Sequence, residues 1–149
     1  MPTTLKLDGF LPYRLSIASN RVSAVIATAY QAMFGLRIPE WRLVAVLAEQ
    51  GAMSQQALCG QTRMDKVTVS RAAIALVERG LVARAANPND QRSNLLELSD
   101  AGWALYERIA PLALEMEQRI FAGFDPAELA QFRSMLERLE AAAAALDPS

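Results

Sequence analysis

The sequence predicts a mainly α-helical protein that carries one small β-hairpin. Apolar residues recur at three- and four-residue steps along several long stretches, which is the spacing of amphipathic helices. Two short apolar stretches, 81–86 and 95–98, flank a loop of polar turn-forming residues, which is typical of a hairpin. The chain has 149 residues, of which 52% are apolar, so it can bury a sizeable core in one domain or in a small domain with additional helices.

Two predicted helices, joined by a short turn, precede the hairpin. Ser54 is a suitable N-cap for a short helix over 55–61, and Asp65 is one for a longer helix that ends near Arg79, because their side-chain oxygens accept early backbone N–H groups. Gly80 can supply the left-handed residue that closes the longer helix. The longer helix then turns inward Val69, Ala73, Leu76 and Val77 and turns outward Val67, Thr68, Arg71 and Ala75.

This order of helix, turn, helix and hairpin is that of a winged helix-turn-helix, which indicates double-stranded DNA as the partner. In such proteins the second helix enters the major groove and the hairpin tip reaches the minor groove. We expect Asp90 to hold the guanidinium of Arg92 at the hairpin tip. The candidate DNA contacts on the helix are Lys66, Val67, Thr68, Ser70 and Arg71. Those on the hairpin are Arg84, Asn89, Asp90, Gln91 and Arg92. Taken one by one, the same residues also suit a solvated helix face and a plain surface turn.

The middle third of the chain resembles the MarR family of bacterial transcriptional regulators. Four runs carry the resemblance: Thr-Val-Ser-Arg at 68–71, Gly-Leu-Val-Ala-Arg at 80–84, Asn-Pro-Asn-Asp-Gln-Arg-Ser at 87–93 and Leu-Glu-Leu-Ser-Asp-Ala-Gly at 96–102. Asn87 departs from the pattern, because the family commonly has Asp there, so a salt bridge from that position is lost. The resemblance implies a ligand-responsive repressor that acts as a homodimer on a palindromic operator.

Long predicted helices flank the hairpin and the helix from Asp65 to Arg79, which we call the reader helix. They cover 12–35, 39–50, 102–122 and 125–146. Pro12 and the run that begins at Asp125 are start signals, and Pro111 should bend the third helix because its ring removes a backbone hydrogen bond. The chain therefore divides into an N-terminal dimerisation helix (1–36), a winged helix-turn-helix DNA-binding domain (37–98) and C-terminal dimerisation helices (99–149).

The apolar stripes of these flanking helices exceed what a winged helix of this size can cover. They either pack on their own domain or join a second copy across a twofold axis. The homodimer is favoured, because one reader helix makes too little contact for tight binding, whereas a dimer places two readers about 34 Å apart, one turn of DNA. The resemblance implies the same arrangement, with intertwined N- and C-terminal helices.

The charge of the chain is unevenly distributed. The net charge is −1 and the pI is about 5.5, which by itself argues against a nucleic-acid binder. Residues 1–98, however, carry 11 Lys or Arg against 7 Asp or Glu, whereas residues 99–149 carry 4 against 9. The basic surplus thus lies in the part that holds the predicted reader, and a local field attracts phosphates.

The sequence lacks the residue patterns of an enzyme. It has no histidine, no glycine-rich phosphate loop and no clustered metal-ligand spacing, so we expect no catalytic residue, no metal and no cofactor. The lone Cys59 is interpreted as a small core residue, with a cysteine-based redox sensor as the alternative. No signal peptide is visible and no apolar run approaches the roughly 20 residues that span a bilayer, so we expect a cytoplasmic protein without membrane contact.

The resemblance also implies a small effector, such as an aromatic acid or its thioester, bound between the dimerisation helices and the reader. Arg14 and Arg21 share a helix face and suit a carboxylate, and Trp41 suits an aromatic ring. These side chains equally suit core packing and ion pairs. The candidate effector residues are Tyr13, Arg14, Asn20, Arg21, Trp41 and Arg42. Two rival functions remain: a winged helix that binds another protein, and a sensor or enzyme that uses this interhelical pocket.

Overall fold

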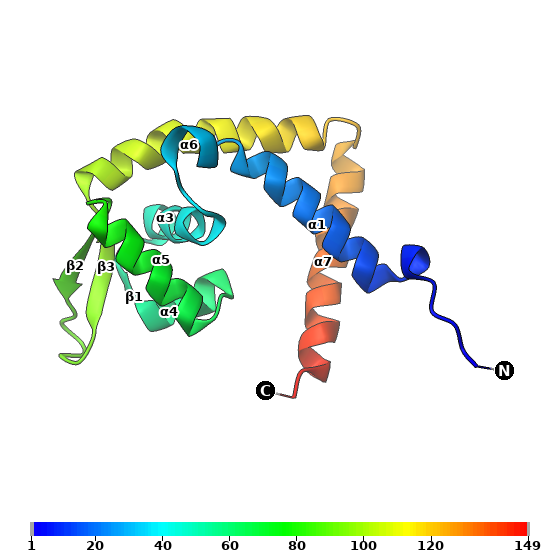
Figure 1. Cartoon of the computed structure of the whole chain (residues 1–149), viewed down its shortest axis with the longest axis horizontal. Helices are drawn as coiled ribbons and strands as arrows, with labels where there is room; N and C mark the ends of the chain where they lie inside the picture. Colours follow the sequence, from blue (N-terminus) through cyan, green and yellow to red (C-terminus); the bar gives the residue numbers. More distant parts are fainter. Residues whose placement is uncertain (1, 149) are drawn as a thin grey trace. The chain divides into compact units, whose positions relative to one another are not determined.

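A computed structural model describes residues 2–148 (Figure 1). The helices are η1 (Leu7–Gly9), α1 (Leu11–Ala27), α2 (Gln31–Phe34), α3 (Ile38–Gln50), α4 (Gln55–Thr62), α5 (Lys66–Glu78), α6 (Asp100–Ile120) and α7 (Pro126–Leu146). The strands are β1 (Met53–Ser54), β2 (Val82–Ala86) and β3 (Asn94–Leu98), which form an antiparallel sheet in the order β1-β3-β2. This confirms the predicted mainly α fold with a small β-hairpin. Within the described residues, no helix is long and apolar enough to cross a membrane.

The chain forms two compact units. One runs up to Met116 and contains α1 to α5, the sheet and most of α6, and the other begins at Glu117 and contains the end of α6 and all of α7. The buried core lies in the first unit, whereas α7 has no buried residue among those described.

The core of the first unit joins α3, α4, α5 and the sheet. Leu43, Val44 and Leu47 of α3 are at most 1% exposed. On the inner face of α5, Val69, Ala73 and Leu76 are each 0% exposed as predicted, whereas Val77, also predicted to face inward, is half-buried. These buried side chains of α3 lie in a helix that contacts α5, α4 and β3.

Side-chain caps begin the helices where the sequence predicted them. The Ser54 hydroxyl accepts the N–H of Ala57 at 3.1 Å at the start of α4. At the start of α7, the Asp125 carboxylate accepts the N–H of Glu128 at 2.8 Å, and the Glu128 carboxylate accepts the N–H of Asp125 at 3.0 Å. This reciprocal pair is a capping box, which satisfies N–H groups that have no partner inside the helix.

The N-terminal helix is not continuous, so the prediction of one helix over 12–35 is wrong. α1 ends at Ala27, a turn follows, and α2 ends at Gly35 in the left-handed conformation with φ of 66°. In the turn, the hydroxyl of Thr28 donates to the Val25 carbonyl at 2.6 Å and competes for an acceptor of the helix. The break also buries Tyr30, which is 2% exposed and contributes to the core. The spacing of apolar residues alone does not reveal this turn, because the turn is stabilised by the burial of Tyr30 in the core.

The hairpin is tied to the start of α6 at its base. Val82 pairs with Leu98 and Arg84 with Leu96 along the two strands. The hydroxyl of Ser99 donates to the Gly80 carbonyl at 2.6 Å and accepts the N–H of Gly102 at 3.1 Å. One side chain therefore joins the end of α5, the hairpin base and the first turn of α6.

The close approach of α6 to the hairpin base yields a testable prediction. A Cβ added at Gly102 would fall on the carbonyl oxygen of Leu81 and lie 3.2 Å from the Leu98 side chain. We expect Gly102→Ala to lower the free energy of unfolding by about 1–3 kcal/mol, as overpacking does. At Gly60 in α4 a Cβ meets nothing within 4 Å. We expect Gly60→Ala to raise the free energy of unfolding by about 0.5–1 kcal/mol.

Urea denaturation at one fixed protein concentration measures both variants. Equal stability of Gly102→Ala and the wild type would contradict the close packing of α6 on the Leu81 carbonyl.

Candidate nucleic-acid interface

One face of α5 is open to solvent opposite the buried face. Lys66, Val67 and Arg71 are exposed, and Thr68 and Ser70 are half-buried. Val67 is 57% exposed, which is high for an apolar side chain within a helix. Arg71 makes no hydrogen bond or ion pair with another described residue. All five predicted reader residues therefore lie on one helix, and both cations among them are exposed.

Asp65 determines what Thr68 can offer a partner. One carboxylate oxygen of Asp65 accepts the N–H of Thr68 at 2.8 Å and the other accepts its hydroxyl proton at 2.8 Å. The backbone hydrogen bond, followed by the hydroxyl hydrogen bond, lowers the pKa of Asp65, so the cap is ionised at neutral pH. Because the hydroxyl of Thr68 donates its hydrogen bond to Asp65, toward a partner it presents only an acceptor oxygen and a methyl group.

The hairpin tip is ordered by its own side chains. Asn87 accepts the N–H of Asn89 at 3.0 Å and donates its amide to the hydroxyl of Ser93 at 3.0 Å. An aspartate at position 87 could accept but not donate in this way, so the amide supplies a contact in place of the salt bridge that was expected to be lost. The turn is thus closed by the side chain that departs from the family pattern.

The prediction that Asp90 holds the Arg92 guanidinium is wrong. The Asp90 carboxylate instead accepts the backbone N–H of Arg92 at 2.9 Å. This local bond to the backbone competes successfully with a contact to a long, mobile side chain. Arg92 is exposed, and its guanidinium is available to a partner.

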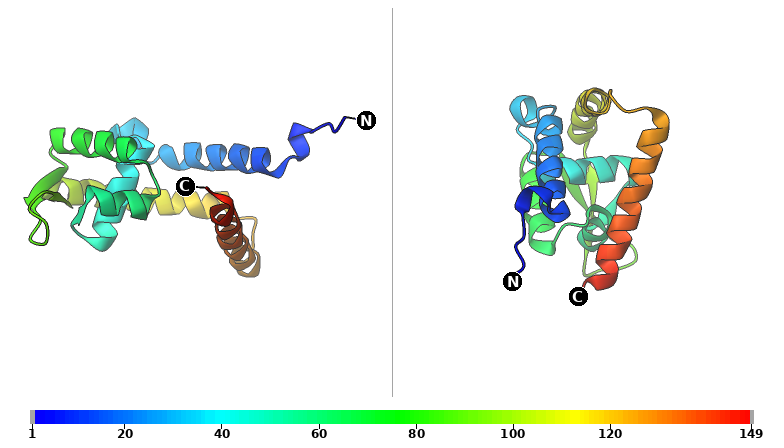
Figure 2. Two further views of the ribbon diagram at one scale, coloured as in Figure 1. Left: turned by 90° about the horizontal axis from the view of Figure 1, so that it is seen from below. Right: turned by 90° about the vertical axis from the view of Figure 1, so that its right-hand side faces the viewer.

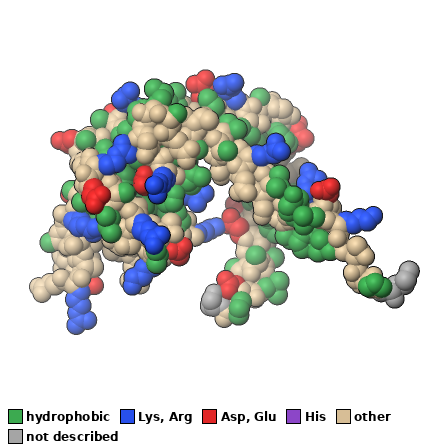
Figure 3. Space-filling model, viewed as in Figure 1, with side chains coloured by type: hydrophobic (Ala, Val, Ile, Leu, Met, Phe, Trp, Pro, Cys, Tyr) green, Lys and Arg blue, Asp and Glu red, His purple; other side chains and the backbone are tan. Residues whose placement is uncertain are grey.

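Of the other candidate DNA contacts on the hairpin (the wing), one lies on a strand and two lie in the loop. Arg84 lies on β2 opposite Leu96, whereas Asn89 and Gln91 are exposed in the loop. The hairpin lies beside α5 (Figure 2). On the face drawn in Figure 3, Lys and Arg side chains gather over the region of α4, α5 and the hairpin. Acidic side chains lie among them on the same face.

The structure brings together only some of the candidate effector residues. Tyr13, Arg14 and Arg21 line an open hollow on α1 of about 500 Å³, together with Asp8, Ile17 and Ala18. Arg14 also donates to the Asp8 carbonyl at 3.3 Å. Asn20 is exposed on α1 but does not line this hollow.

Trp41 and Arg42 lie on α3 and do not line the hollow on α1. The Trp41 ring stacks on Tyr30 at 5.5 Å and on Tyr106 at 5.9 Å between centroids. Burial raises the pKa of Tyr30, and the nearby charge of Arg42 partly opposes this rise. In a single chain, Trp41 is therefore a packing residue of the first unit and is not assembled with the arginines of α1.

Two arginines that sequence analysis did not single out lie beside the reader. Arg79 donates to the Phe34 carbonyl at 2.7 Å and to the Gly35 carbonyl at 3.4 Å. Arg37 and Arg79 line a hollow together with Arg71 of the reader face. The sequence holds no signal for this contact, because its partners are 44 and 45 residues apart.

No structural observation supports metal or cysteine chemistry in the described part of the chain. Residues 2–148 contain no group of three His, Cys, Asp or Glu side chains that could hold a metal ion. Cys59 is half-buried and packs against the core of the first unit.

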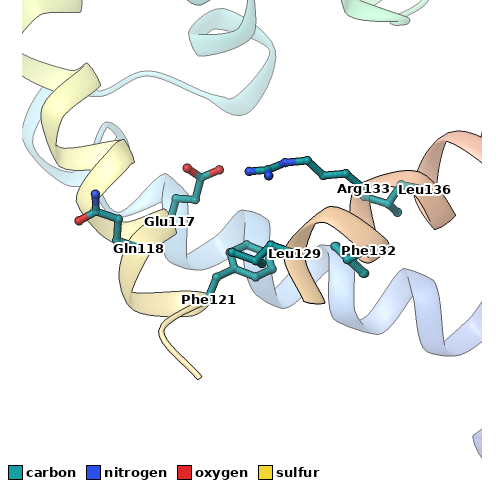
Figure 4. Close-up of a pocket in the computed structure, with 7 residues that line it drawn as sticks. All are labelled: Glu117, Gln118, Phe121, Leu129, Phe132, Arg133 and Leu136. Carbon is teal, nitrogen blue, oxygen red and sulfur yellow. The ribbon is translucent and has the colours of Figure 1, made fainter. Parts of the chain in front are cut away.

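The second unit carries an apolar hollow between the end of α6 and α7 (Figure 4). The hollow measures about 350 Å³. Phe121 and Phe132 lie 6.1 Å apart between centroids, and Glu117 and Arg133 point toward one another across the hollow. The lining residues are Glu117, Gln118, Phe121, Leu129, Phe132, Arg133 and Leu136.

Two helices joined by a tight turn, followed by a β-hairpin on the same core, define a winged helix-turn-helix protein. The family model described as "MarR family" matches residues 34–93, which include α3, α4, α5, β2 and the hairpin loop. The chain belongs to the MarR family of transcriptional regulators.

Individual relatives agree with this assignment. The chain is 28% identical over 102 residues to the transcriptional repressor IacR of Pseudomonas putida, covering 68% of this chain and 61% of that repressor, less than two thirds of its length. A probable transcriptional regulator from Pseudomonas aeruginosa is 32% identical with a TM-score of 0.81, over 90% of this chain and 99% of that chain. A structure of BpsR from Bordetella bronchiseptica, whose DNA binding is regulated by 6-hydroxynicotinic acid, is 28% identical with a TM-score of 0.78, over 87% of this chain and 98% of that chain.

Proposed function

We propose that this protein binds a palindromic DNA operator as a homodimer and represses transcription until a small aromatic acid releases it. The observation that carries the proposal is the exposed face of α5 beside an ordered hairpin that presents Arg92 at its tip. A transcriptional regulator acts where the chromosome lies, which in bacteria is the cytoplasm.

The chemistry of the α5 face suits base edges in the major groove. The free guanidinium of Arg71 can donate two hydrogen bonds to N7 and O6 of guanine. The exposed Val67 and the methyl group of Thr68 suit the methyl group of thymine. Lys66 and Ser70 lie near the start of α5, where a cation and a hydroxyl suit backbone phosphates.

The hairpin suits the minor groove. Arg92 presents a cation at its tip, and narrow A·T-rich minor grooves attract arginine. Asp90 accepts the backbone N–H of Arg92 and so positions the tip that presents this cation. Asn89 and Gln91 can bind the sugar–phosphate backbone beside the tip, and Arg84 can reach a flanking phosphate.

Two single substitutions test the reader and the wing. Selection from a library of random duplexes first supplies the preferred sequence. We expect Arg71→Ala to weaken binding to it by about 1–3 kcal/mol and to relax preference at one base pair in each half-site. We expect Arg92→Ala to weaken binding and to change preference mainly in the A·T-rich flanks, because the minor groove distinguishes chiefly A·T from G·C.

Fluorescence anisotropy on the selected duplex and its single-base variants measures both effects. Unchanged affinity in both variants, with unchanged circular dichroism, would contradict DNA reading by α5 and the hairpin. Binding that does not weaken as salt rises would favour the rival function, a winged helix that binds protein, because phosphate contacts release counterions.

The terminal helices support the homodimer. Along α7, Phe132 is 45% exposed, Leu139 is 46% exposed and Leu146 is 85% exposed. On α1, Leu11 is 78% exposed and Leu15 is 44% exposed. Apolar helix faces of this length mark an interaction surface, and a second copy of the chain supplies a matching one. A twofold dimer also presents two reader helices, which accounts for a palindromic operator.

A charge placed on the exposed apolar face of α7, which carries Phe132, Leu139 and Leu146, should dissociate the dimer. We expect Phe132→Asp to give a monomer or an aggregate, because a carboxylate cannot be buried there without a partner. Ser134→Asp is the matched control, since Ser134 is exposed on the opposite side of the same helix. Light scattering at micromolar concentration distinguishes the states. A wild-type monomer under these conditions would refute the proposed dimer.

The hollow on α1 supports an aromatic acid as the effector. Arg14 and Arg21 can bind a carboxylate, and Tyr13 and Ile17 offer an apolar wall for a ring. The relative BpsR is regulated by an aromatic acid, 6-hydroxynicotinic acid. Trp41 is not part of this site, because its ring stacks on Tyr30 and Tyr106.

Loss of one arginine of this hollow should remove the response to effector but not the binding of DNA. A panel of aromatic carboxylates and their thioesters is titrated into the protein–DNA complex, and at least one compound should release the DNA. Arg21→Gln should abolish that release, because a ligand shifts an equilibrium only by its differential affinity for the two states. If no compound changes the DNA affinity of the wild type, the effector proposal fails and DNA binding stands.

A further inference from the structure

A basic hollow lies between the start of α3 and the exposed side of α5. It measures about 430 Å³ and lies outside the hairpin and the hollow on α1. Its walls come from two segments that are far apart in the sequence. The lining residues are Gly35, Arg37, Pro39, Glu40, Thr68, Arg71, Ala72, Ala75 and Arg79.

Small side chains create the hollow and cations surround it. Ala72 and Ala75 lie one turn apart on α5, and their small side chains leave space beside the helix for the hollow. Three arginines line it against one carboxylate, that of Glu40, which is 8% exposed. Glu40 accepts the backbone N–H of Arg37 at 3.0 Å, so part of its capacity as an acceptor is already used. The lining is therefore positive overall and suits an anion.

Arg79 positions the wall that carries Arg37. Its guanidinium donates to the carbonyls of Phe34 and Gly35, at 2.7 Å and 3.4 Å, which attaches the segment before α3 to the end of the reader helix. The ring of Phe34 is in turn covered by the guanidinium of Arg108, 4.8 Å from its centroid. The segment is thus held from two sides, and Arg37 follows it directly in the chain.

We propose that this hollow is a third DNA contact, in which Arg37 binds a backbone phosphate of the duplex that α5 reads. The inference rests on the proposed function, because it assigns a further contact to the same DNA. Thr68 and Arg71 line both the reader face and the hollow, so a duplex held by α5 brings its backbone to this rim.

The shape of the hollow favours a DNA backbone over a small ligand. Gly35, Arg37, Arg71 and Arg79 are all exposed, so the hollow is open along its rim. Small-ligand sites enclose most of the surface of their ligand, whereas a phosphodiester backbone presents a convex charged ridge. Arg37 makes no side-chain hydrogen bond or ion pair with a described residue, so binding a phosphate breaks no existing contact.

The test measures how the affinity for a 30-base-pair duplex of random sequence depends on salt. Each phosphate contact contributes about 0.9 to the slope of log K against log salt, so in a dimer Arg37→Gln should reduce the slope by about 1.8. Between 50 and 200 mM salt, the wild type should then lose about 12-fold more affinity than the variant. The selected operator should show the same difference, because a phosphate contact carries no sequence information.

Two further variants complete the test. Arg37→Lys should restore most of the slope, because an ammonium group also binds phosphate. Arg119→Gln removes the same charge from an exposed position on α6 that does not line the hollow, and it should leave the slope unchanged. A slope for Arg37→Gln equal to that of Arg119→Gln would overturn the third contact while the proposed function stands. A wild type with no salt-dependent DNA binding would overturn the proposed function and this inference together.

Discussion

The burial of Val69, Ala73 and Leu76 is the packing interaction on which the rest of the structure depends. These side chains attach α5 to α3, α4 and β2, and each is 0% exposed. Truncating a buried Leu to Ala costs about 2–5 kcal/mol, which is a large share of the stability of a small domain. Because the inner face of α5 supplies the packing, the side chains on its outer face are not needed for the core and are free to contact a partner. The packing of the inner face also determines the direction in which these outer side chains point.

A small number of polar contacts then orient the elements around α5. Asp65 begins the helix, Arg79 joins its end to the segment before α3, and Ser99 joins the hairpin base to α6. Each of these bonds satisfies a backbone group that the fold would otherwise leave without a partner. They also hold the start of α5, the segment before α3 and the base of the hairpin within the first unit.

An aromatic stack connects α3 and the segment before α2 to the long helix α6. Tyr30 before α2, Trp41 in α3 and Tyr106 in α6 stack in sequence, and Trp103 meets Tyr106 edge-on at 6.1 Å between centroids. Aromatic pairs of this kind contribute about 0.5–1.5 kcal/mol each beyond the area that they bury. A displacement of α6 at Tyr106 would therefore disturb the stack with Trp41 of α3.

The sequence by itself determined the fold class, the helix starts and the reader face, because these depend on local chemistry. The Ser54, Asp65 and Asp125 caps and the apolar spacing of α5 act within one or two turns, so they can be read from neighbouring residues. Only the tertiary structure decided the break after Ala27, the placement of Trp41 in a stack and the hollow of Arg37. The break and the stack follow from burial against distant elements, and the hollow from contacts across more than 40 residues. Such contacts leave no periodicity and no spacing in the chain, since folding alone brings their partners together.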